Sequence, residues 1–116
     1  MTAAGLRKIA NALPASTEQI QWENDRVFKV GGKMFACSGI ERNSHYSFKV
    51  DDERFLELTD QRGIAPAPYL ARAKWIQINP SECELPDREI EKLIRRSYEL
   101  VLAKLPKKTQ RQILEG

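Results

Sequence analysis

The sequence predicts an α+β fold in which helices pack on an antiparallel sheet. Two segments, one near each end of the chain, carry apolar residues at helical spacing. Between them, RVFKVGGKMFACSG and HYSFKV alternate apolar and polar residues, which is typical of strands. Because the strands are grouped rather than strictly alternating with helices, we expect the order helix, three strands, helix, one or two strands, helix.

The first helix is predicted at about residues 2–13. Its apolar residues recur every three or four positions, and Pro14 closes the pattern. Three successive antiparallel strands are predicted near residues 26–31, 33–39 and 45–50.

The pair Gly31-Gly32 separates the first two of these strands. A phosphate-binding loop would need a glycine five residues before Gly32 and a serine or threonine after Lys33, but the sequence has Val27 and Met34 there. Two residues between strand-like runs instead fit a tight hairpin turn, since glycine reaches positive φ without strain. We therefore expect a hairpin turn that binds no ligand.

A two-residue turn fixes the register of the two strands, and the register predicts which side chains share a face of the sheet. It sets Phe28 opposite Phe35, and the aromatic side should face the helices because aromatic rings bury the most apolar area. The opposite side should meet solvent and carry polar and basic residues, namely Lys29, His45, Ser47 and Lys49.

The second half of the chain begins with a helix over VDDERFLELTDQRG, capped by Asp51 or Asp52 and stopped by Gly63. Pro66 and Pro68 exclude a helix from IAPAPYLA, which is expected to be an extended edge or loop. KWIQIN is predicted to be a short strand.

The last predicted helix starts at Pro86 and ends near Pro106, where a short basic tail follows. Its positions that recur at helical spacing should pack on the aromatic side of the sheet. These are Ile90, Leu93, Ile94, Ser97, Tyr98 and Val101.

Composition favours one soluble globular domain over residues 1–116. The chain is 41% hydrophobic and 30% charged, and its apolar runs are far shorter than the roughly 20 residues that cross a bilayer. No export signal is visible, and Cys37 and Cys83 do not have a Cys-x-x-Cys spacing. We expect a cytoplasmic protein with no membrane partner.

No catalytic or metal-binding pattern stands out. His45 is the single histidine, and no G-x-S-x-G motif accompanies it. A zinc site would need more ligands at metal spacing. The carboxylates of residues 51–53 begin a helix, where capping explains them. We therefore expect no enzyme, no cofactor and no small-molecule ligand.

The charge is uneven along the chain. The net charge is +3; residues 1–60 hold eight Lys/Arg against nine Asp/Glu, and residues 61–116 hold eleven against seven. A basic terminal segment attracts nucleic acid but also serves as a solubilising end. APAPYLARAKWIQI groups Tyr69, Arg72, Lys74 and Trp75, which suits nucleic acid unless the two rings are core anchors.

The whole chain resembles the MmcQ/YjbR family of small bacterial proteins. The resemblance rests on NALP, VFKVGGKMFA, SFKV, PAPYLARAKWI and SYELVLAKLPKK, in that order. It implies an α+β fold of the type III secretion chaperone-like class, in the order helix, three strands, helix, two strands, helix.

The resemblance also implies a DNA-binding protein. The positions of the family motifs that could meet phosphates are Lys29, Lys33, Lys49, Arg72, Lys74, Lys104, Lys107 and Lys108. The alternative is a protein-interaction module without chemistry, because a secretion-chaperone-like fold can bind a partner segment on an exposed face.

Overall fold

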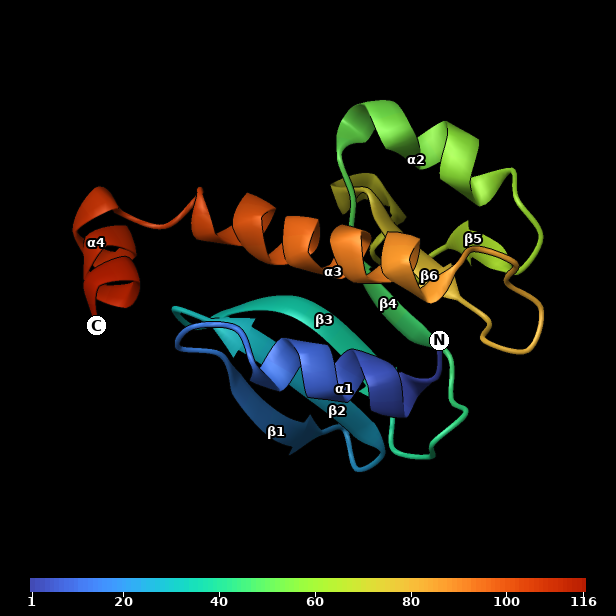
Figure 1. Ribbon diagram of the computed structural model, residues 1–116, viewed down its shortest axis with the longest axis horizontal. Helices are drawn as coiled ribbons and strands as arrows, with labels where there is room; N and C mark the ends of the chain where they lie inside the picture. The colour runs from blue at the N-terminus through green and yellow to red at the C-terminus, as the bar shows by residue number, and fades with distance from the viewer.

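The computed structural model describes residues 1–116 and contains one six-stranded sheet in the order β1-β2-β3-β4-β6-β5, with every neighbouring pair antiparallel (Figure 1). The strands are β1 Thr17–Gln21, β2 Asp25–Val30, β3 Lys33–Gly39, β4 Tyr46–Lys49, β5 Ile64–Pro66 and β6 Trp75–Ile78. The helices are α1 Ala3–Asn11, α2 Asp52–Thr59, α3 Asp87–Leu102 and α4 Lys107–Glu115, with a 3₁₀ turn, η1, at Ala71–Ala73. The predicted α+β class is confirmed.

Helices cover only one face of the sheet. α1 and α3 lie side by side across it (Figure 1), and α2 packs beside β5 and β6. Phe28, Phe48 and Ile76 point into the core below these helices, together with Leu58 of α2. The other face carries no helix, as expected for a solvent-facing side, and we call it the open face.

Two elements were not predicted. β1 is a polar edge strand, TEQIQ, in which no residue is buried, so its sequence lacks the apolar alternation that reveals a strand. α4 occupies the segment expected to be a basic tail, and it too buries no residue. The predicted run of three strands is therefore corrected to four. No helix combines the length and apolar character needed to cross a bilayer.

The predicted hairpin turn is confirmed. Gly31 and Gly32 have φ values of 57° and 79°, and Val30 pairs with Lys33 across them. The two glycines differ in their surroundings, because a Cβ on Gly31 would meet Leu105 at 2.5 Å while one on Gly32 would meet nothing within 4 Å.

This difference predicts unequal costs for two otherwise similar substitutions. Gly32→Ala should cost about 1–2 kcal/mol, since its only penalty is a Cβ in the left-handed region. Gly31→Ala should cost about 1 kcal/mol more, because Leu105 must also shift. Urea unfolding of the two variants measures the difference, and equal costs would show that the Leu105 contact contributes nothing.

The pairing beyond the turn differs from the prediction. Phe28 lies opposite Ala36 instead of Phe35, because Phe35 forms a bulge between the pairs Lys29–Met34 and Phe28–Ala36. Phe35 and Ala36 are both fully buried in the core. Cys37 is thereby moved to the open face, where it pairs with Val27.

A buried serine of α3 meets this bulge. The Oγ of Ser97 donates to the carbonyl of Phe35 at 2.7 Å and accepts from the backbone N–H of Lys49 at 2.9 Å. Tyr98 adds an edge-to-face contact with Phe35, with ring centroids 5.3 Å apart. The irregular part of β3 is therefore tied to the long helix by both polar and aromatic contacts.

Candidate functional site

A row of uncharged side chains crosses the open face from one edge of the sheet to the other. Cross-strand partners share a face, so the pairing aligns one residue from each strand. In strand order these are Gln19, Val27, Cys37, Ser47, Gln77 and Ala65. The row gives the open face a neutral centre of mixed polar and apolar side chains.

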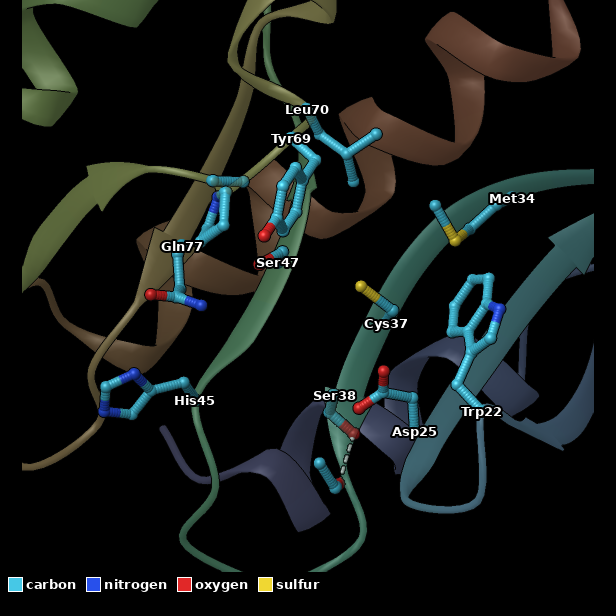
Figure 2. A pocket seen from close by; sticks show the side chains of 13 residues that line it. Trp22, Asp25, Met34, Cys37, Ser38, His45, Ser47, Tyr69, Leu70 and Gln77 are labelled. Atoms are coloured by element: carbon cyan, nitrogen blue, oxygen red, sulfur yellow. Dashed lines mark hydrogen bonds between the residues drawn. The ribbon is translucent and has the colours of Figure 1, made fainter.

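A cavity of about 490 Å³ lies over the middle of this row, within the size range of small-ligand sites. Figure 2 shows Cys37 and Ser47 between two aromatic side chains, Trp22 and Tyr69, which stand on opposite sides of the cavity. The bulge in β3 contributes directly, because it places the Cys37 side chain here instead of in the core.

The two aromatic residues come from loops. Trp22 lies in the β1–β2 turn with φ 50°, and its side chain is 69% exposed. Tyr69 lies between β5 and η1 with φ 66° and is fully exposed. Left-handed backbone is costly for aromatic residues, and neither ring gains core burial in return. These exposed rings are the most unusual feature of the cavity.

The Cys37 thiol of the cavity is not a ready nucleophile. Burial, together with the negative charge of Asp25, raises the pKa of the Cys37 thiol to about 11, so the thiol stays protonated at neutral pH. No group of three or more His, Cys, Asp or Glu side chains is placed to hold a metal ion. The lining can instead stack on a ligand and form hydrogen bonds with it.

Cations from distant parts of the chain meet at one end of the sheet. Burial, and the nearby charges of Lys104 and Lys74, lower the pKa of Lys49, with Asp52 acting in the opposite direction. The Lys49 ammonium also donates to the carbonyl of Ala73. These contacts join the end of β4, the start of β6 and the end of α3.

The contact between Gly31 and Leu105 adds the β2–β3 hairpin and the start of α4 to this group. Lys29, Lys33, Lys49 and Lys74 therefore lie at the end of the sheet where β2 and β4 finish and β3 and β6 begin, and Lys104 approaches Lys49 there. The remaining three cations, Arg72, Lys107 and Lys108, lie within three residues of Lys74 or within four of Lys104 along the chain. We call this the basic end; it comprises Lys29, Lys33, Lys49, Arg72, Lys74, Lys104, Lys107 and Lys108.

Three carboxylates lie beside the basic end, at the start of α2. Asp51 is paired with Arg96 at 3.0 Å, and Arg96 lowers its pKa. Asp52 and Glu53 line a depression with Lys49 and Lys104 on the side away from the open face. Positive charge thus exceeds negative charge here. The expectation that Lys29, Ser47 and Lys49 meet solvent is corrected, because both lysines are half-buried and Ser47 is buried.

The two aromatic residues near Arg72 were expected either to contact nucleic acid or to anchor the core, and the structure places them differently. Trp75 is buried, as expected of a core anchor, whereas Tyr69 is exposed. Sequence reasoning missed Trp22, and it missed the role of Ser47 and Gln77 in lining a cavity. A tryptophan inside the polar stretch QWENDR was the available signal, because large aromatic residues are seldom placed in water without a reason.

Comparison with known proteins agrees with this architecture. The model of the YjbR family matches residues 11–100. The chain belongs to the YjbR family. None of the curated proteins compared with this YjbR-family chain matches it.

Two solved structures share the fold of this YjbR-family protein. A crystal structure of a Deinococcus radiodurans protein with a DUF419 domain has 31% identity and a TM-score of 0.82, covering 97% of this chain and 87% of that one. A Pseudomonas syringae protein has 23% identity and a TM-score of 0.72, covering 87% of this chain and 99% of that one. The second similarity concerns the fold alone.

Proposed function

We propose that this YjbR-family protein binds DNA through its basic end. The observation that carries the proposal is the convergence of eight cations from five separate segments, in a chain whose net charge is only +3. Folding concentrates positive charge where the sequence shows only a mild excess. Such a patch attracts phosphates irrespective of base sequence.

The proposal is one of binding without catalysis, in the cytoplasm. Both cysteines are free, which suits a reducing compartment. The protonated thiol of Cys37 offers no nucleophile at neutral pH. The sheet holds the backbone that carries Lys29, Lys33 and Lys49, so these cations are presented from a rigid support, whereas Lys107 and Lys108 lie on α4, which buries no residue.

Salt dependence tests the proposal. Each neutralised phosphate releases condensed counterions, so about five contacts with duplex DNA give a slope near −4.5 in log affinity against log salt concentration. Affinity should fall several hundredfold between about 50 and 200 mM salt. Fluorescence anisotropy with a labelled oligonucleotide of about 20 nucleotides, used as a duplex and as a single strand, measures this slope.

Paired variants make the test specific. Lys33→Ala with Lys104→Ala removes two exposed cations from the basic end and should flatten the slope for duplex DNA by about two units. Arg42→Ala with Arg88→Ala changes the net charge equally at the opposite end of the fold and should leave the slope unchanged. Absence of binding at low salt, or equal effects of both pairs, would contradict the proposal.

A protein-interaction module is the second candidate function, and α4 is the observation that favours it. This helix buries no residue, and the Leu114 side chain is 67% exposed. An apolar residue on a helix that packs so little against its own domain could contact a partner helix. If the titrations above detect no binding of DNA, protein interaction becomes the better-supported function.

A further inference from the structure

We infer that the cavity on the open face holds an unpaired base of single-stranded DNA between Trp22 and Tyr69, while the basic end holds the adjoining phosphates. The inference rests on the proposed DNA binding and names the form of DNA that the site selects. Its basis is the combination of exposed rings, an uncharged floor and cations on one side only.

Each of the two rings is accessible for stacking on a planar group. Trp22 and Tyr69 are exposed, line the same cavity and approach it from opposite sides (Figure 2). Both are held in left-handed backbone, although neither helps to bury the core. Every base presents a π-face, so aromatic side chains bind unpaired bases without a sequence requirement.

The floor of the cavity suits the edge of a base. Ser47 and Gln77 face the cavity (Figure 2), and neither side chain forms a hydrogen bond within the protein. The hydroxyl of Ser47 and the amide of Gln77 are therefore free to bind a ligand. Hydroxyl and amide groups can each donate to and accept from the edge of a base.

Charge orients the bound strand. Lys29 lies two residues along its strand from Val27 of the central row, roughly 6–7 Å away at the rise of a β-strand. Asp25 lines the cavity without a cation partner and lies on the other side of the row, where it would repel a phosphate. Phosphates are therefore favoured toward the basic end.

A base in a duplex cannot enter this site without leaving its stack and its partner, which costs a few kcal/mol. A single strand avoids that cost, because its bases can be turned outward and stacked on side chains. The site should consequently prefer single-stranded over duplex DNA of the same length.

The test measures binding of a labelled oligothymidylate of about 20 nucleotides and of its duplex with oligoadenylate, at fixed low salt. We expect tighter binding of the single strand, quenching of tryptophan fluorescence on binding, and loss of that quenching in Trp22→Phe. Trp22→Ala and Tyr69→Ala should each weaken single-strand binding about tenfold, whereas Trp22→Phe should retain most of the affinity. Leu56→Ala, an exposed apolar residue on α2, is the control and should change nothing.

The outcomes separate this inference from the proposed function. Binding that depends on salt and on the basic end but is equal for duplex and single strand, or indifferent to Trp22→Ala and Tyr69→Ala, would overturn the inference and leave DNA binding standing. Failure to bind either form of DNA would overturn both. Circular dichroism of each variant shows whether a loss of binding reflects unfolding.

Discussion

Replacing Ser97 with alanine is expected to lower the free energy of unfolding by about 2–4 kcal/mol, because a buried hydroxyl serves two backbone groups at once. The substitution leaves the carbonyl of Phe35 and the N–H of Lys49 without this partner in a region closed to water. Each lost partner costs about 1–3 kcal/mol when the remaining group stays buried. This is a large fraction of the roughly 5–15 kcal/mol that stabilises a domain.

Ser38→Ala is the matched control for this prediction. Ser38 is also buried, but its hydroxyl donates only to the neighbouring carbonyl of Gly39 at 2.8 Å. Its loss should cost about 1 kcal/mol or less. Urea unfolding followed by circular dichroism compares the two variants. If Ser97→Ala costs no more than Ser38→Ala, the bridge between α3 and the bulge does not stabilise the fold.

Glu18 should make the stability of the protein depend on pH in the acidic range. Its carboxylate receives hydrogen bonds from Arg7 at 2.7 Å, Arg26 at 2.9 Å and Asn11 at 3.1 Å, which link α1, β1 and β2. The bond from Arg7 is the main reason why the pKa of Glu18 falls to about 2. In the unfolded chain, a glutamate has a pKa near about 4.3.

A folded pKa below the unfolded one means that the ionised form stabilises the native state. The contribution, about 1–2 kcal/mol because solvent screens the pair, is complete above the unfolded pKa and is lost as pH falls from about 4.3 to about 2. Glu18→Gln should therefore reduce the free energy of unfolding at pH 7, and the difference from the unmodified protein should shrink toward zero near pH 2. Unfolding by urea at several pH values measures it.

Glu57→Gln provides the comparison for Glu18. Glu57 pairs with Arg54 on the exposed side of α2, where solvent weakens ion pairs. Its replacement should change stability by less than about 0.5 kcal/mol at any pH. A difference for Glu18→Gln that stays constant from pH 7 to pH 2 would show that the pairing with Arg7 is not the source of the stabilisation.

The sequence alone determined the elements whose signals are local. The Gly31-Gly32 turn follows from the need for positive φ, and α3 follows from an apolar stripe between two prolines. β4 presents Tyr46 and Phe48 to the core and Ser47 to the open face, as alternation requires. The eight cations of the basic end were also named from sequence motifs, one by one.

Tertiary structure alone decided the register beyond the turn and the presence of the cavity. The bulge at Phe35 is stabilised by Ser97, which lies 62 residues away, so no local pattern around Phe35 could predict it. The same bulge determines that Cys37 faces the cavity. β1 and α4 escaped prediction because neither buries a residue, and burial is what produces a readable apolar period.

The meeting of the eight cations was likewise a tertiary result. Lys33, Lys74 and Lys104 are far apart in the chain. Antiparallel pairing brings the end of one strand and the start of the next to the same end of the sheet. Leu105, just after α3, lies against Gly31 and so brings the end of α3 to the same place. Composition records only a net charge of +3, since it has no information about position. The pairing of six strands also places the neutral row on the open face, and the strands carry the loops that hold Trp22 and Tyr69. No single segment of the sequence contains that pairing, so the sequence alone could not predict the cavity.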